Sequence, residues 1–348
     1  MPFDIWTLYN ETRKYYALIP PPAFLLTLFI DAPFGRFSWK SGGLLGLFQV
    51  DGIKSWIVME LVSPMTFIYA LLQAPFTSSA SSGALKLFSK IGGAQRIMTD
   101  QFPLFPSLSA LSMLSSKQKV LASLFLIHYA NRAIISPLRT PGRSPSNIAV
   151  VICAIVFNLV NGSLMGSYIS SDECQSFLQF TSSLRFWFGI ALWTAGFIGN
   201  IVHDEILLNI RRRHQSAAAK KSDKEDKKEM HYAIPHGLLY EFVSYPNYFC
   251  EWVEWIGFAL AASPVPPFLS SRSSRLLSPF TQHSELASSF SGGLLDILQA
   301  YTQASPPWLF VFAEIFTMAS RAWRGHQWYK SKFPEYPTRR TAVVPFLL

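Results

Sequence analysis

Charged residues are scarce in this chain. Only 15% of its 348 residues are Asp, Glu, Lys or Arg, while 50% are hydrophobic and the mean hydropathy is +0.23. Soluble domains carry about 25% charged residues. The length alone would allow two soluble domains, but the shortage of charge argues against them and indicates a membrane protein.

Cysteine is also rare, and the usual signatures of metal and nucleotide sites are missing. Cys153, Cys174 and Cys250 are far apart, with no CxxC pair and no Cys/His cluster, so we predict neither a disulfide framework nor a metal site. The chain has no GxGxxG after a strand, no GxxxxGK[ST], no HExxH and no serine elbow. A nucleotide would therefore have to bind among helices.

Long apolar runs are abundant, and each transmembrane helix needs about 20 mainly apolar residues. The polar and aromatic residues 1–15 do not form a cleavable signal peptide, so the first apolar run is expected to remain as a membrane anchor. Seven spans are predicted near 16–32, 53–72, 119–138, 147–166, 184–202, 247–262 and 307–323.

These runs predict an all-α integral membrane protein, a single domain over residues 1–348 with about seven transmembrane helices, and the polar faces described below predict that these helices enclose one shared cavity. Three polar loops interrupt the runs, at 76–118, 212–230 and 263–305. Residues 212–230 are charged and of low complexity, with nothing to pack, so we expect this loop to be disordered.

Lysine and arginine are unevenly distributed between the two sides of the predicted membrane domain. With seven spans, one side collects the loops 33–52, 139–146 and 203–246 together with the C-terminal tail, and it holds most of the basic residues. By the positive-inside rule this side, with the C-terminus, is cytosolic and the N-terminus is not. Topology and an anionic cofactor then account for the net charge of +9, so we predict no nucleic-acid partner.

Polar residues form stripes at helical spacing inside the predicted spans. Asn247, Glu251 and Glu254 share one face, and Glu60 lies near the middle of its span, where an ionisable group costs several kcal/mol and points to function. Stripes near span ends have a second interpretation, as residues that contact lipid headgroups. The further stripes are Trp56 with Glu60, Tyr129 with Arg132, Asn200 with Asp204 and Arg211, and Arg321 with Tyr329.

Several of these segments resemble the steroid 5α-reductase family, and in particular a fungal-type member with extra loops. The three polar loops are the parts that the resemblance leaves out. The matching segments are "APFGRF" (32–37), "MELVSP" (59–64), "IHYANRAIISPLRTPGRSP" (127–145), "NIVHDEILLNIR" (200–211), "YAIPHGLLYEFVSYPNYFCEWVEWIGFALA" (232–261) and "RAWRGHQWYKSKFPEYPTRRTAVVPFLL" (321–348).

The resemblance implies seven transmembrane helices in the endoplasmic reticulum membrane and reduction of the C4–C5 double bond of a 3-oxo-Δ4-steroid by NADPH. It implies that Glu60 and Tyr129 hold the ketone of the steroid or other lipid substrate. Tyr129 is a suitable hydrogen-bond donor to the ketone oxygen, where negative charge develops. The implied cofactor contacts are Trp56, Arg132, Arg143, Asn200, Asp204, Arg211, Asn247, Glu251, Arg321 and Tyr329.

Two departures from the family pattern leave the substrate open. Ala233 stands where the family usually has a basic residue, and Gly325 with His326 stands where it often has consecutive histidines. A polyprenol or trans-2-enoyl-CoA reductase would use the same cavity. An S-adenosylmethionine-dependent methyltransferase of the isoprenylcysteine type would explain "SYPNYFCEW" but not Glu60, and a non-catalytic lipid-binding membrane protein is the third alternative.

Overall fold

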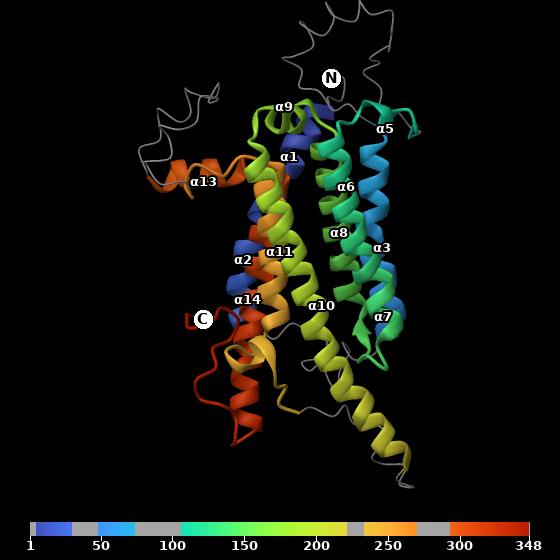
Figure 1. Ribbon diagram of the computed structural model, residues 1–348, viewed down its shortest axis with the longest axis vertical. Coiled ribbons are helices and arrows are strands. Elements are labelled where there is room, and N and C mark those ends of the chain that lie inside the picture. Colours follow the sequence, from blue (N-terminus) through green and yellow to red (C-terminus); the bar gives the residue numbers. More distant parts are fainter. Residues whose placement is uncertain (1–4, 30–47, 74–105, 221–232, 270–292, 348) are drawn as a thin grey trace, which may run out of the picture.

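The structure, a computed structural model, describes residues 5–29, 48–73, 106–220, 233–269 and 293–347. Long helices run side by side along one axis and form a bundle (Figure 1). The elements are α1 (Ile5–Leu18), α2 (Pro20–Phe29), β1 (Gln49–Val50), α3 (Gly52–Leu71), α5 (Ala110–Met113), α6 (Ser116–Tyr129), the π-helix η4 (Ala130–Ile135), α7 (Ser136–Arg139), β2 (Ser146–Asn147), α8 (Ile148–Ile169), α9 (Asp172–Phe180), α10 (Ser183–Lys220), the 3₁₀ helix η5 (Leu238–Glu241), α11 (Pro246–Ala262), α13 (Leu294–Thr302) and α14 (Pro306–Lys332).

Within the described residues, three helices are long and apolar enough to cross a membrane. They cover Ser116–Arg139, Ile148–Ile169 and Ser183–His214. The other long helices are shorter or more polar: α11, for example, has 17 residues and carries two carboxyl groups. The bundle is thus mostly helical and suited to a membrane, and the count of seven spans stays a prediction.

Two predicted spans differ from the helices observed. The run near 16–32 is divided between α1 and α2. Pro20, Pro21 and Pro22 have no N–H to donate backward into a preceding helix, so they begin a new one. At the other extreme, α10 continues well past 202 and ends at Lys220, inside the segment predicted as a loop; residues 221–230 lie outside the described part.

The charged end of α10 is helical because its side chains find partners. The guanidinium group of Arg212 contacts Glu205 at 2.6 Å and Asn209 at 3.0 Å, seven and three residues back. Glu205 also pairs with Arg139 of α7 at 2.6 Å. Alanines at 217–219 have the highest helix propensity of any residue. Local pairing and propensity thus replace the apolar packing that this segment lacks.

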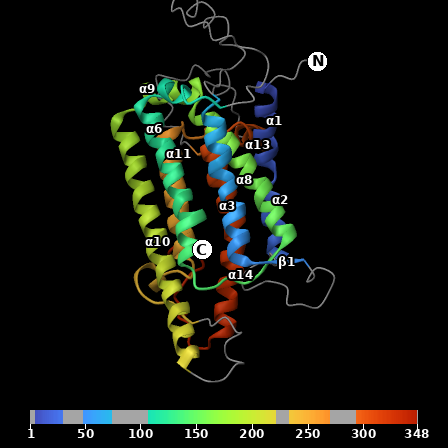
Figure 2. The same ribbon diagram turned by 90° about the vertical axis from the view of Figure 1, so that its right-hand side faces the viewer.

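Small residues let two helix pairs approach closely. A Cβ atom added at Gly162 or Gly166 of α8 would strike the backbone carbonyls of Ser63 and Phe67 on α3. Figure 2 shows α3 and α8 side by side along their length. The pair α10 and α11 is built in the same way, through Gly189, Gly196, Gly199 and Gly257. Small residues at contacts between helices are typical of membrane bundles.

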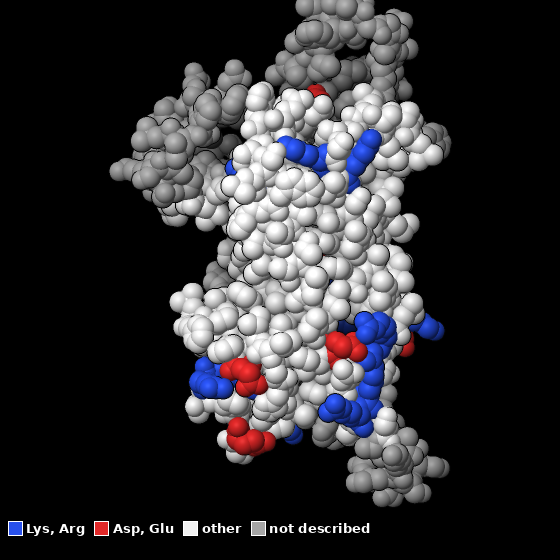
Figure 3. Space-filling model, in the orientation of Figure 1, with Lys and Arg blue, Asp and Glu red and all other residues white. Residues whose placement is uncertain are grey.

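Charge is confined to the two ends of the bundle on the face drawn in Figure 3, where a broad band without Lys, Arg, Asp or Glu separates them. The lower end in Figure 1 gathers β1, α7, the end of α10, η5 and the end of α14. These are the segments that the sequence predicted on the basic side. The N-terminus lies at the opposite end.

Candidate active site

Arg132 on η4 connects two helices that are far apart in the sequence. Its Nε lies 3.7 Å from Glu60 Oε1 on α3, and its Nη1 lies 3.6 Å from Glu251 Oε2 on α11. Glu60 is 9% exposed and Glu251 is 2% exposed. Two buried carboxylates thus share one guanidinium group, which compensates for much of the cost of placing their charge inside the bundle.

The polar stripes of α10 and α11 face each other and continue this network. The Asn200 amide donates to Glu251 Oε2 at 3.2 Å and to the Asn247 carbonyl at 3.1 Å. The Asn247 amide donates to Asp204 Oδ1 at 2.9 Å. Asn247 Oδ1, by contrast, is buried without a hydrogen-bond partner. Since buried acceptors are nearly always paired, this atom is suited to a donor from a ligand.

Tyr129, the last residue of α6, lies on the other side of the network. Its hydroxyl oxygen accepts a hydrogen bond of 3.2 Å from the Asn161 amide of α8, which also lies 3.4 Å from the Ser63 hydroxyl. Ser63 follows Glu60 by three residues on α3, so the two share a helix face. The phenol is 3% exposed, and its bond to Asn161 uses a lone pair of the oxygen and not the hydroxyl proton.

A stack of arginines on Trp56 lies toward the basic end. The indole Nε1 donates to the Arg132 carbonyl at 3.1 Å, and the guanidinium groups of Arg132 and Arg143 lie 4.8 Å and 3.5 Å from the ring centroid. Burial and the positive charges of Arg132, Arg211 and Arg321 lower the pKa of Arg143, which lies in the loop after α7. Arg143 thus carries its charge in an environment where three other arginines disfavour it, an arrangement that an anionic ligand would relieve.

The π-helix η4 sets the direction of Arg132. The Ser136 amide donates to the Asn131 carbonyl, five residues back, where an α-helix would use four. The wider turn lies directly between Tyr129 and the rest of the network. Single π turns inside α-helices are frequent at functional sites.

The remaining predicted residues lie on α10 and α14. Arg211 and Arg321 belong to the arginine group around Arg143. Tyr329 is buried and stacks on Tyr336 of the C-terminal tail at 5.3 Å between ring centroids. The two departures from the family pattern lie nearby: Ala233 is half-buried before η5, and Gly325 is packed so tightly under the Tyr245 ring that no side chain fits there.

Sequence reasoning missed two members of the site. Asn161 connects Tyr129 to α3, and the position of this amide inside an apolar span is the feature of the sequence that indicates it. Glu314 on α14 is half-buried, and it interacts electrostatically with Glu251, Arg132 and Glu60. It lies near the middle of a predicted span, so the argument that selected Glu60 would also have selected Glu314.

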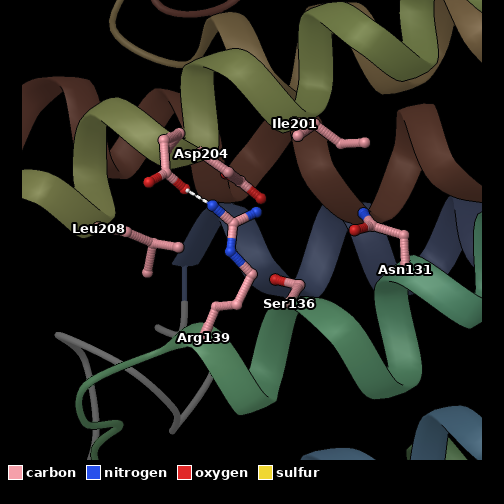
Figure 4. Close-up of a pocket in the computed structure, with 7 residues that line it drawn as sticks. Asn131, Ser136, Arg139, Ile201, Asp204 and Leu208 are labelled. Atoms are coloured by element: carbon pink, nitrogen blue, oxygen red, sulfur yellow. Dashed lines mark hydrogen bonds and ion pairs between the residues drawn. The ribbon is translucent and has the colours of Figure 1, made fainter.

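A pocket with about 230 Å³ of empty space, part of it open to solvent, adjoins the network between α7 and α10. Figure 4 shows Arg139 reaching from α7 toward α10, where it pairs with Glu205. Asp204, which holds Asn247, also lines this pocket. No group of three or more potential metal ligands occurs among the described residues. The pocket's residues are Asn131, Ser136, Arg139, Ile201, Asp204, Glu205 and Leu208.

Comparison with known proteins supports one family. The profile of the family described as 3-oxo-5-alpha-steroid 4-dehydrogenase matches residues 144–269 and 297–348. The chain is 33% identical to a Schizosaccharomyces pombe protein described only as uncharacterized, over 98% of this chain and 99% of that protein.

Two named relatives match over nearly the whole chain. Identity is 27% with 3-oxo-5-alpha-steroid 4-dehydrogenase 1 of Bos taurus, covering 93% of this chain and 91% of the relative. It is 26% with steroid 5-alpha-reductase DET2 of Arabidopsis thaliana, covering 94% and 92%. The profile match and these relatives agree with the resemblance of the motifs, so the chain belongs to the steroid 5-alpha-reductase (3-oxo-5-alpha-steroid 4-dehydrogenase) family.

Proposed function

We propose that the protein reduces the C4–C5 double bond of a 3-oxo-Δ4-steroid, or of a similar lipid enone, with NADPH. The observation that carries the proposal is the position of Tyr129 and Glu60 beside the Arg132 network, in a chain of this family. The relatives' names refer to 3-oxo-5-alpha-steroids and to steroid 5-alpha-reduction. In this proposal an enone acceptor binds beside Tyr129 and Glu60, and a reduced nicotinamide binds beside the polar stripe of α10 and α11.

Tyr129 is assigned to the ketone oxygen. During reduction of an enone, negative charge develops on that oxygen, and a fixed donor in a dry site stabilises it by about 3–4 kcal/mol. The Asn161 amide orients the phenol by donating to it. Glu60 shares the face of α3 that carries Ser63, which places its carboxyl group on the Tyr129 side of the network. The enolate formed in this way must then gain a proton at the α-carbon of the acceptor.

The polar stripe of α10 and α11 is assigned to the nicotinamide. When bound, NADPH supplies the hydride for the β-carbon of the enone. The unpaired Asn247 Oδ1 fits the amide group of the nicotinamide ring, which carries two N–H donors. Asp204 and Asn200 would hold Asn247 in place by hydrogen bonds to its side-chain amide and its carbonyl.

The arginine group is assigned to the phosphates. Arg132, Arg211 and Arg321 each interact electrostatically with Arg143. Guanidinium groups bind phosphate oxygens through forked contacts. Two of these groups, those of Arg132 and Arg143, pack on the Trp56 ring. A cofactor with an additional 2′-phosphate uses more of this positive charge, so we expect NADPH to bind in preference to NADH.

The proposed location is the endoplasmic reticulum membrane, with α1–α2, α3, α6–α7, α8, α10, α11 and α14 as the seven spans. The basic end and the C-terminus face the cytosol, and the N-terminus faces the lumen. Glycosylation tags at both termini test the orientation. A tag that becomes glycosylated at the C-terminus would overturn it.

Product analysis tests the function directly. Purified protein in lipid nanodiscs is offered NADPH or NADH with each of three acceptors: a 3-oxo-Δ4-steroid, a polyprenol and a trans-2-enoyl-CoA. We expect mass spectrometry to show a gain of two hydrogens on the steroid with NADPH, and much less with NADH. Reduction of only the polyprenol or the enoyl-CoA would replace the acceptor but keep the cofactor site. No product from any acceptor would contradict the proposal.

A further inference from the structure

A buried pair outside the assigned chemistry joins α6 to α11. His128 Nδ1 lies 2.6 Å from Glu254 Oε1, and the two residues are 5% and 0% exposed. Aromatic rings enclose the imidazole: its centroid lies 4.6 Å from Trp255 and 5.1 Å from Tyr129. The proposed function uses neither member of this pair.

The pair lies where the two halves of the site meet. His128 directly precedes Tyr129, which is assigned to the acceptor. Glu254 follows Glu251 by three residues and Asn247 by seven, so all three share the face of α11 that is assigned to the cofactor. A hydrogen bond between His128 and Glu254 limits how far α6 can shift along α11 and how far it can rotate about its own axis. It thereby fixes the position of Tyr129 relative to the cofactor residues.

Stability alone gives little reason for such a pair. Glu254 Oε2 is buried without a hydrogen-bond partner, which costs free energy inside a protein. Replacing buried ionisable pairs by apolar residues of similar volume is often neutral or stabilising, and their best-supported role is to fix the register of packed helices. Here the register in question is that of an acceptor helix against a cofactor helix.

We propose that His128 and Glu254 form a positioning pair, which holds the Tyr129 hydroxyl at the correct distance from the cofactor bound along Asn247 and Glu251. The inference rests on the proposed function. Breaking the pair removes no contact to either ligand, so it should slow the chemical step and leave cofactor binding intact. A displacement of about 1 Å in a reacting geometry can cost 10²-fold in rate.

The test compares three variants in nanodiscs with NADPH and the acceptor that the wild-type protein reduces. Glu254→Ala breaks the pair and Glu254→Gln keeps a side chain able to bond to His128. Tyr168→Phe is the control: it removes another buried hydrogen bond on α11, from the Tyr168 hydroxyl to the Ala262 carbonyl at 3.1 Å, but at the opposite end of the helix. Turnover per folded molecule, KM for NADPH and melting temperature are measured for each.

We expect Glu254→Ala to lower kcat by about 10- to 100-fold with less than about a twofold change in KM for NADPH. Glu254→Gln should recover most of the activity, and Tyr168→Phe should lower the melting temperature without lowering kcat. If Glu254→Ala does not fold, His128→Phe replaces it in the same comparison.

Three outcomes are decisive. Full kcat in the folded pair-breaking variant, with only the melting temperature lowered, would show a purely structural pair and overturn the inference. An increase in KM for NADPH as large as the loss of kcat would make the pair part of cofactor binding and overturn it too. Absence of turnover in the wild-type protein would defeat the proposed function, and the inference with it.

Discussion

Helix α11 meets two of its neighbours, α10 and α6, in different ways. Against α10, glycines bring the backbones into direct contact, and the hydrogen bonds of the polar stripes lie beside that contact: an added Cβ at Gly196 would strike the backbone of Cys250 and Glu254, and one at Gly257 would strike the backbone of Trp193. Against α6 and η4 the contact is made by long polar side chains, His128 to Glu254 and Arg132 to Glu251. At the first interface the helix backbones are in direct contact. At the second, long polar side chains lie between the helices, and these side chains can bind a ligand.

This difference indicates how one part of a membrane bundle can fix the positions of helices while another part presents polar side chains to a ligand. The glycine contacts fix α10 and α11 as one unit, so the Asn200, Asp204 and Asn247 stripe is held by backbone packing. The proposed chemistry takes place at the polar interface. Substitutions should therefore separate into two classes, those that reduce turnover and those that reduce stability.

The largest expected effect is on turnover, at the polar interface. Tyr129→Phe removes one donor to the developing oxyanion, so kcat should fall about 10²–10³-fold while NADPH binding stays nearly unchanged. Glu60→Gln should also lower kcat, and the double variant should lose less than the product of the two single losses because both serve one oxygen. Steady-state kinetics and NADPH titration measure this. Full activity in both folded single variants would remove the proposed mechanism.

The next effect is on stability, at the glycine interface. Gly196→Leu forces α10 away from α11, and overpacking of this kind typically costs about 1–3 kcal/mol. The neighbouring Ala195→Leu adds similar bulk on an exposed position of the same helix and should cost little. Thermal unfolding in nanodiscs compares the two. Equal melting temperatures would mean that the glycine contact does not hold the pair together.

A smaller effect is expected where the two interfaces join. Asn247→Ala removes the group assigned to the nicotinamide amide, so KM for NADPH should rise about tenfold, equivalent to about 1.4 kcal/mol, and more than KM for the acceptor. Thr194→Ala is a matched control, because this exposed hydroxyl bonds only within α10, to the Ile190 carbonyl. A rise confined to the acceptor KM would refute the assignment of Asn247.

The smallest effect concerns the loop that precedes α11. Glu241 accepts a hydrogen bond from the Gly237 amide at 2.8 Å, and this bond, with nearby basic side chains, lowers the pKa of the Glu241 carboxyl group. A lowered pKa means that the carboxylate stabilises the loop above the ordinary value of about 4.3, and that this stabilisation is lost as pH falls through the lower folded-state value. The protection factor of the Gly237 amide, which is the intrinsic exchange rate divided by the measured rate at each pH, should therefore fall only in acid, and Glu241→Gln should abolish this dependence.

The sequence predicted which polar residues lie together more closely than it predicted the helix boundaries, and the roles of these residues stay a prediction. Glu60, Arg132, Asn200, Asp204 and Asn247 were selected because polar groups at helical spacing cannot face lipid, and the structure brings all five into one network. That argument depends only on residue type and spacing, which tertiary packing does not alter.

What the sequence did not predict depends on contacts between distant segments. The helical state of residues 212–220 draws on Glu205 and Arg139, and the contact of Tyr245 with Gly325 joins residues 80 positions apart. Neither follows from a hydropathy pattern. The π turn of η4 also could not be predicted from the spacing of apolar residues, because its wider turn departs from the 3.6-residue period of an α-helix.

That turn has a consequence for how this chain can change over evolutionary time. A π turn is equivalent to an α-helix that has gained one residue, and each residue of an α-helix advances by about 100°. The wider turn absorbs that extra 100°, so deleting one of residues 130–135 would restore a regular helix and leave the residues beyond it near their present orientation, but it would change the directions of the side chains inside the turn, Arg132 included. The direction of Arg132 therefore depends on the number of residues in segment 130–135, and we expect orthologues that retain the same site to keep that number.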